Sequence, residues 1–195
     1  MAVLAPEEPH HGGGLSSRSA QRDAGLMKQL FMFYVGGEAP GANIEVHDVQ
    51  FVAADTPEQA FPTLQKRWYG IPESLHVDTW TRVTWADGHD VTLSAEYPVG
   101  DQKLWFLNMG GYRKGLIPEL HACGLFVAPT QAEAKKRAKK ILLAGVTLQH
   151  TDDQIDIDDC LNLTDIDGLH IQLTPNPHGN ADSQPEFQGY LPLTT

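Results

Sequence analysis

The feature that most constrains this chain is a repeat of its own sequence. Residues 36–47, GGEAPGANIEVH, return at residues 110–121 as GGYRKGLIPELH. At a constant offset of 74, residues 30–60 and 104–134 share nine identities in 31 ungapped columns, where average residue usage supplies roughly two. The identities are Leu30/Leu104, Gly36/Gly110, Gly37/Gly111, Gly41/Gly115, Glu45/Glu119, His47/His121, Ala54/Ala128, Thr56/Thr130 and Ala60/Ala134. We therefore expect an internal duplication, in which two copies of one small unit share a fold.

Length and composition set the broad class. The chain has 195 residues, of which 41% are hydrophobic, enough for one sizeable core or for two small modules that share one. No run approaches the roughly 20 apolar residues that a membrane helix needs, and the first residues lack the pattern of a secretory signal. We expect a cytoplasmic protein with no membrane partner.

The net charge indicates which partners are excluded, and the cysteines indicate the redox compartment. The net charge of −11 argues against nucleic acid, because phosphate binding needs a concentrated positive surface. The cysteines, Cys123 and Cys160, stand where the other copy has Val49 and Trp80. Reduced thiols are therefore expected rather than a disulfide framework. The sequence leaves open a homo-oligomer and the nature of any small-molecule or protein partner.

The apolar runs predict the elements of each copy. Residues 30–35 and 104–109 are short apolar runs stopped by a Gly pair, which indicates a buried strand and a turn. Residues 45–54 and 119–128 suit a second strand, and Thr56 and Thr130 suit the N-cap of a following helix. At an offset of 80, the Asp-Gly pairs at 87–88 and 167–168 predict hairpins. We predict an α+β fold that duplicates a β-β-α-β-β unit, with helices packed on sheet and the repeats related by a pseudo-twofold axis.

The expected boundaries follow from changes in composition. Residues 1–26 mix Pro, Gly, Ser and charge without apolar periodicity, which predicts a disordered extension. Met27 reads like a natural start, so translation from Met1 or from Met27 is left open. We expect the first repeat at 27–95, a linker at 96–102 and the second repeat at 103–174. The Pro-rich tail at 175–195 cannot continue a sheet easily and is expected to pack on the repeats.

The residues also carry a family likeness. The run LFMFYVGGEAPGANIEVHDVQFVAAD, together with WADGHDVTL and its second copy, resembles a bacterial domain family known only as domain of unknown function 1543. The resemblance covers residues 27–192 and implies a member with two copies of the domain. It implies no catalytic residue, because the family has no established activity. The copies depart from each other at Asn43/Ile117 and Asp48/Ala122, which weakens an expectation of equal chemistry in both.

The two Glu-x-His pairs are the strongest candidates for a site. Successive strand residues point to opposite faces, so Glu45 and His47 share a face, as do Glu119 and His121. If the strand ends are adjacent, these four side chains converge as two imidazoles and two carboxylates. That set suits Zn, Mn or Fe, and Cys123 would add a thiolate. The sequence thus predicts a small-ligand or divalent-metal-binding protein with a site at the repeat interface, and leaves open whether it is an enzyme.

Other interpretations stay open. Each His can pair with its neighbouring Glu or with the glycine loop, which makes the protein a non-catalytic structural or protein-interaction module. Backbone N–H groups of the Gly pairs can bind an anionic ligand, although the spacing is not that of a P-loop; these residues are Gly36, Gly37, Gly110 and Gly111. Cys123 beside His121 can also be read as an activated nucleophile.

The aspartates near residue 155 form a further cluster. They are Asp152, Asp153, Asp156, Asp158 and Asp159. Because no Gly and distal Glu follow at EF-hand spacing, we expect a solvated acidic edge that deters association between sheets.

Overall fold

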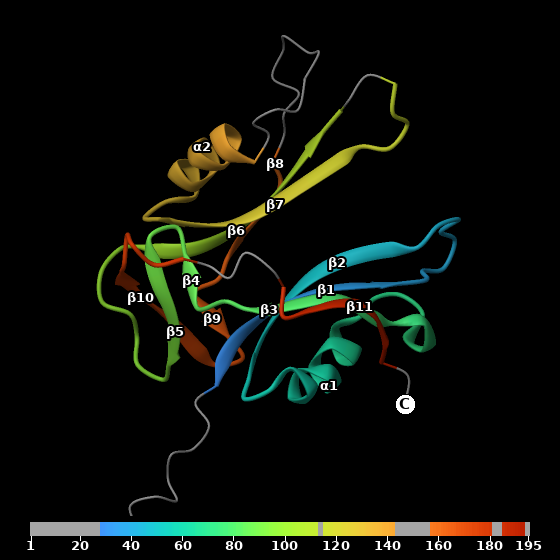
Figure 1. The fold of residues 1–195 in the computed structure, drawn as a ribbon, viewed down its shortest axis with the longest axis horizontal. Helices are drawn as coiled ribbons and strands as arrows, with labels where there is room; N and C mark the ends of the chain where they lie inside the picture. Colours follow the sequence, from blue (N-terminus) through green and yellow to red (C-terminus); the bar gives the residue numbers. More distant parts are fainter. Residues whose placement is uncertain (1–27, 113–114, 143–156, 181–184, 194–195) are drawn as a thin grey trace, which may run out of the picture.

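The computed structural model describes residues 28–112, 115–142, 157–180 and 185–193. Both halves of the chain have the same order of elements (Figure 1). The first repeat contains β1 (Gln29–Gly37), β2 (Val46–Ala54), α1 (Pro57–Arg67), the 3-10 turn η1 (Pro72–Ser74), β3 (His76–Arg82), β4 (Trp85–Ala86) and β5 (His89–Ser94). The second contains β6 (Lys103–Gly111), β7 (Leu120–Ala128), α2 (Gln131–Ile141), β8 (Ile157–Asn162), β9 (Asp165–Ile166) and β10 (Leu169–Pro175). The predicted α+β duplication is confirmed, and each copy has one additional strand of two residues.

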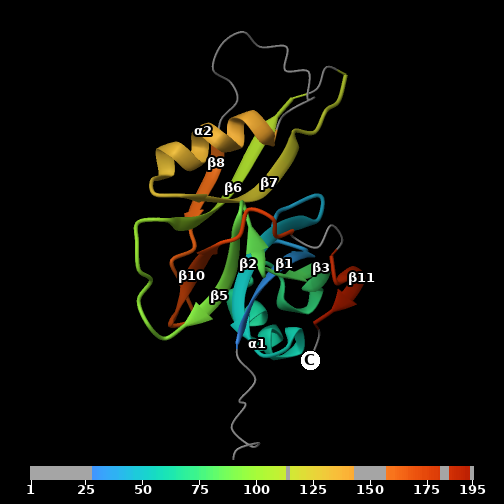
Figure 2. The ribbon, with the colours of Figure 1, turned by 60° about the vertical axis from the view of Figure 1, so that its left-hand side comes forward.

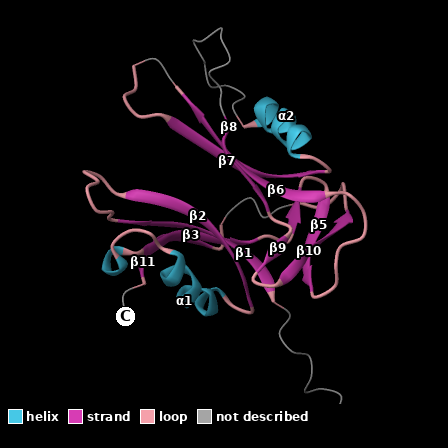
Figure 3. Ribbon diagram, turned by 180° about the vertical axis from the view of Figure 1, so that it is seen from behind, coloured by secondary structure: helices cyan, strands magenta, loops and turns pink. Residues whose placement is uncertain are grey.

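Three antiparallel sheets are arranged between the two helices. Their strand orders are β11-β3-β1-β2, β7-β6-β8 and β4-β5-β10-β9, where β11 (Phe187–Pro192) comes from the tail. Figures 1 and 3 show α1 and α2 on the outer faces of the first two sheets, whose inner faces look toward each other. The third sheet combines one hairpin from each repeat and closes one end of the molecule (Figure 2).

The long apolar runs arise because the central strands are buried on both faces. Along β1, Phe31, Phe33 and Val35 pack toward α1, whereas Leu30 and Met32 belong to the core between the repeats. Alternation of side chains along a strand produces this division. A strand that is covered on both faces shows a nearly continuous apolar run rather than an alternating one.

The hairpin turns have the backbone that their sequence predicts. Asp87 and Gly88 have φ of 49° and 84°, and Asp167 and Gly168 have φ of 54° and 80°. Two successive positive φ values are typical of a type I′ turn, which Asp-Gly adopts readily. The two hairpins then meet, because β5 pairs with β10 along residues 89–94 and 170–175.

Each hairpin turn of one repeat binds the other repeat. Asp87 accepts hydrogen bonds from the backbone N–H of Val127 at 2.8 Å and from the guanidinium of Arg137. Asp167 does the same with the N–H of Ala53 at 3.0 Å and with Arg67 at 2.5 Å. Because the bonds are reciprocal, each turn holds a strand and a helix of the opposite copy in position.

The C-terminal tail departs from expectation by joining a sheet. Strand β11 pairs antiparallel with β3, with Phe187 opposite Trp80 and Pro192 opposite His76. The register shifts between Gln188 and Leu191. The tail tolerates its prolines because β11 is an edge strand and Pro192 is its last residue. Leu193 is buried beyond this strand, where its N–H donates to the carbonyl of Leu75 at 2.9 Å.

Several residues for which the sequence makes a prediction lie outside the described part of the chain. Residues 1–26, Asp152, Asp153 and Asp156 are not among the described residues, and neither are the side chains of Asp158 and Asp159. Among the described parts of the chain, no helix has the length and apolar character needed to cross a membrane.

The reciprocal turn contacts generate a prediction about stability. We expect Asp87→Gly and Asp167→Gly each to lower the free energy of unfolding by about 1–3 kcal/mol, because each leaves a buried backbone N–H without its acceptor. Glycine keeps the positive φ of the turn, so the change isolates the carboxylate. Urea unfolding gives the measurement, with Asp101→Gly in the exposed linker as the control. Equal stability of all three variants would contradict the proposed role of the turns.

Candidate metal site

Two histidines flank one glycine in the first sheet. Gly36 of β1 lies opposite His47 of β2 on one side and opposite His76 of β3 on the other. Directly opposed residues of neighbouring antiparallel strands point to the same face. The sheet therefore presents His47, Gly36 and His76 as a row, with both imidazoles over the central strand.

The absence of a side chain at Gly36 lets the imidazoles approach each other. A Cβ at this position would lie 2.8 Å from His47 Cδ2 and 2.8 Å from His76 Nε2. Since real Cβ atoms do not come so close to other heavy atoms, any larger residue would push the rings apart. The first Gly of the pair therefore serves the geometry of the two histidines.

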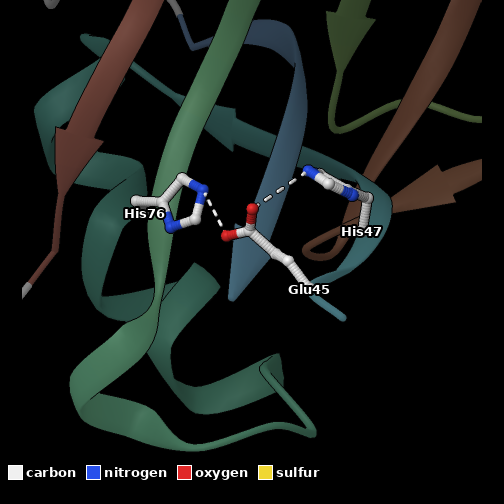
Figure 4. Close-up of side chains that lie close together, drawn as sticks. All are labelled: Glu45, His47 and His76. Carbon is white, nitrogen blue, oxygen red and sulfur yellow. Dashed lines mark ion pairs between the residues drawn. The ribbon is translucent and has the colours of Figure 1, made fainter. Parts of the chain in front are cut away.

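A carboxylate on each side of the row completes the cluster. Glu45 lies between the imidazoles, with Oε1 3.0 Å from His76 Nε2 and Oε2 3.9 Å from His47 Nε2 (Figure 4). Asp78 also reaches both rings, at 3.3 Å from each Nε2 atom. One donor atom each from Glu45, His47 and His76 lies within 4.8 Å of the others, which is compatible with one metal ion.

The hydrogen bonds of His76 leave its Nε2 atom facing the carboxylates. His76 is only 3% exposed, and its Nδ1 lies 3.0 Å from the carbonyl oxygen of Ser74. A carbonyl can only accept, so Nδ1 carries a proton and Nε2 of the neutral ring has a lone pair. That lone pair points at two anionic side chains. A cation between the ring and these side chains would therefore be favourable.

Asp78 has an oxygen without a hydrogen bond. Its Oδ2 atom is buried and accepts no hydrogen bond from any described residue, even though His47 Nε2 lies 3.3 Å away. A buried carboxylate oxygen is costly to leave unpaired. A cation at this point would remove that cost.

Aromatic rings cover both imidazoles. Tyr34 stacks on His47 with ring centroids 5.1 Å apart, and Tyr190 of the tail lies 4.3 Å from the ring of His76. Burial, the charge of Asp78 and that of Cys123 raise the pKa of Tyr34. The Tyr34 hydroxyl therefore keeps its proton beside the cluster at neutral pH.

The second repeat keeps the Glu-His pair but not the same surroundings. Glu119 Oε2 and His121 Nε2 are 3.8 Å apart, and Asn108, which takes the place of Tyr34, lies 3.4 Å from His121 Nδ1. At the offset of 80, the residue that matches His76 is Asp156, which is outside the described residues. The four predicted metal ligands are thus brought together as two separate pairs, and the described cluster of three donors belongs to the first repeat alone.

The glycine pairs lie within strands. Gly36 and Gly37 end β1, and Gly110 and Gly111 end β6, each paired to the neighbouring strand. A Cβ on Gly37 would lie 2.8 Å from Ser74 Oγ and 2.8 Å from Trp68. Close packing explains why Gly36 and Gly37 are glycines. Binding of an anion by the backbone N–H groups of the four glycines stays a prediction.

Cys123 does not have the environment of an activated nucleophile. Desolvation raises the pKa of its thiol above the usual value. Activation requires a lowered pKa, because the thiolate is the reactive form. The shift thus opposes the nucleophile interpretation.

Sequence reasoning missed His76. Its signal was a second alternating pair, His76-x-Asp78, at the start of a strand that borders β1 on the side opposite β2. The match of Asp78 with Asp158 was visible in the repeat. His76 itself stood out less because the second copy has an aspartate there.

Comparison with solved structures finds a protein with a similar fold. A structure described as "Crystal structure of a protein Il1583 from Idiomarina loihiensis" superposes with a TM-score of 0.67. The two sequences are 28% identical, and the match covers 86% of this chain and 99% of that chain. Among proteins with curated descriptions, none matches this chain.

The family match follows the internal repeat. The family described as Domain of Unknown Function (DUF1543) matches residues 42–93 and again residues 117–173. Each match begins in the loop before the second strand of a repeat and ends in its last hairpin strand. The chain belongs to the DUF1543 family and carries two copies of its domain.

Proposed function

We propose that this protein binds a divalent transition metal through His47, His76 and Glu45, with Asp78 as a further carboxylate ligand. The observation that carries the proposal is the convergence of two Nε2 atoms on two carboxylates over Gly36. Neutral imidazole donates a lone pair to a metal, and two carboxylates balance the charge of a divalent ion.

The spacing of the donor atoms supports this proposal. Nitrogen and oxygen donors of a tetrahedral zinc ion, with bonds of about 2.0–2.1 Å, lie about 3.3 Å from one another. The four distances between a histidine Nε2 atom and a carboxylate oxygen in this cluster are 3.0, 3.3, 3.3 and 3.9 Å. Only small rotations of the side chains are needed to surround an ion, and Zn, Mn and Fe all accept this mixture of donors.

The hydrogen bond at Nδ1 of His76 is of the kind that metal-bound histidines commonly make. Metal-bound histidines commonly donate their other ring N–H to a carbonyl or carboxylate, which fixes the tautomer and the orientation of the ring. Ser74 provides that carbonyl from η1, directly before β3. His76 is thereby held ready to coordinate through Nε2.

The outer side of the cluster is open to solvent. The side chains of His47 and Glu45 are 35% and 44% exposed, whereas that of His76 is 3% exposed. Structural zinc sites are closed, and catalytic sites keep one position for water or substrate. We infer that a bound metal has an accessible side, so the site suits ligand binding or hydrolytic and redox chemistry better than a purely structural role.

The alternative is a non-catalytic module in which a proton takes the place of the metal. A protonated His76 would bridge Glu45 and Asp78, and both Glu-His pairs would serve only to hold their strands. The observation in favour is that a Glu-His pair occurs in each repeat at nearly equal separation, 3.9 and 3.8 Å. Under this alternative the geometry shared by the two repeats would support protein interaction rather than ligand binding.

Metal content distinguishes the two proposals. We expect protein purified without chelator or affinity metal to contain close to one equivalent of Zn, Mn or Fe, measured by elemental analysis. His47→Ala and Asp78→Asn should remove it, because each deletes a ligand. His121→Ala alters the matching residue of the second repeat and should retain the metal.

The fold of each variant is checked by circular dichroism. Loss of metal from a folded Asp78→Asn variant supports the site, since asparagine preserves the shape of the side chain. A wild-type protein without metal, with His47→Ala and His121→Ala lowering the melting temperature equally, would favour the structural module.

The role of Gly36 gives a second prediction. We expect Gly36→Ala to weaken zinc binding at least tenfold, because its Cβ would occupy the space into which both imidazoles close. Competition with a chromophoric chelator measures the affinity. Gly110→Ala, at the matching position of β6, should leave the affinity unchanged. If both variants bind zinc as the wild type does, the metal is not held over Gly36.

A further inference from the structure

A cavity of about 240 Å³ lies between the facing sheets of the two repeats. Its lining combines Met32 from β1, Phe106 from β6, Cys123 and Leu125 from β7, and Trp85 and Asp87 from the first hairpin. Both copies are thus needed to form it, unlike the proposed metal site. The volume is below that of a pocket for a drug-sized molecule, about 300–1,000 Å³. It exceeds the 150 Å³ apolar cavity that holds benzene in another protein.

The cavity presents no uncommitted charge to a ligand. Asp87 is its single ionised side chain, and both carboxylate oxygens are engaged, by Arg137 and by the N–H of Val127. Trp85 Nε1 donates to the carbonyl of Asn176 at 2.9 Å, so its polar atom is engaged as well. The raised pKa of Cys123 keeps its thiol neutral. The remaining surface favours an uncharged, apolar group.

The cavity and the proposed metal site lie along the same face of β1. Met32, Tyr34 and Gly36 alternate on that face, and four residues of strand span about 13 Å. Tyr34 connects the two ends, because its ring stacks on His47 while its hydroxyl lies close to the side chains of Asp78 and Cys123. The Tyr34 hydroxyl at this point can form a hydrogen bond with a polar group that crosses from the cavity to the metal.

We propose that the cavity binds the apolar end of a small molecule, a single ring or a short branched chain, whose polar end reaches the metal. The binding of an apolar group in the cavity does not depend on the proposed function, whereas the binding of the polar end to a metal rests on it. The ligand class is therefore an amphipathic small molecule with a neutral body and a metal-binding head, such as a carboxylate.

The first experiment tests the cavity without the metal. Protein labelled with 13C in its methionine methyl groups, treated with chelator, is titrated with toluene. We expect a saturable shift of the Met32 signal and no shift of Met109, which is buried on the opposite face of β6 toward α2. Cys123→Phe should abolish the Met32 shift by filling the cavity, and Cys123→Ser should preserve it.

The second experiment tests the connection to the metal. Phenylalkyl hydroxamates with two to five methylene groups carry an apolar ring and a metal-binding head. For the best chain length we expect binding to zinc-loaded protein at least tenfold tighter than to metal-free protein, while toluene binds both equally. Cys123→Phe should weaken this ligand although it leaves the zinc affinity unchanged.

The outcomes separate the two proposals. Absence of a toluene-dependent shift at Met32, or an equal shift in Cys123→Phe, overturns the apolar pocket whatever the metal result. Toluene binding to a protein that takes up no zinc overturns the proposed function and leaves the pocket in place. Zinc uptake without any gain for the hydroxamates overturns the connection between the two sites.

Discussion

The reciprocal hydrogen bonding of the two hairpin turns is the interaction on which the fold depends. Asp87 and Asp167 each leave their own repeat and bind a backbone N–H and an arginine of the other. A three-stranded sheet with one helix has an inner apolar face that must be covered. The turns fix the distance and angle at which the second sheet provides that cover. The cavity between the repeats lies at one of these turns, because Trp85 and Asp87 are part of its lining.

The proposed chemistry is less symmetric than the fold. Duplication preserved the Gly pair and the Glu-x-His pair in both copies. The partners from the third strand diverged, since His76 has an aspartate as its counterpart at position 156. A site built from three strands can thus be retained in one copy and changed in the other without loss of the architecture. This explains why residues that recur in the sequence were only part of the donor set.

The features of the fold that depend on local sequence patterns could be predicted from the sequence. The duplication, the order of strands and helices and the positions of the hairpins follow from apolar runs, caps and Asp-Gly pairs, and the structure agrees with them. The pairing of β5 with β10 could not be predicted, because no local sequence pattern indicates which distant strand a hairpin will pair with. The arginines that bind the turns could not be recognised in the sequence for another reason. Arg67 and Arg137 lie at an offset of 70 rather than 74, one helical turn out of alignment, so comparison of the copies does not pair them. His76 was missed because the second repeat has an aspartate, not a histidine, at the matching position 156.

The first repeat is completed by β11, a strand that follows the second repeat in the sequence. Its strand neighbours β3, Pro192 lies opposite His76, and the ring of Tyr190 covers the imidazole. During synthesis, which proceeds from the N-terminus, the donors Glu45, His47 and His76 emerge long before the strand that shields one of them. A nascent chain or a fragment truncated before residue 187 would thus expose the edge of β3 and the face of His76 to water. Burial of His76 in its final environment therefore requires that the ribosome has synthesised the chain through β11.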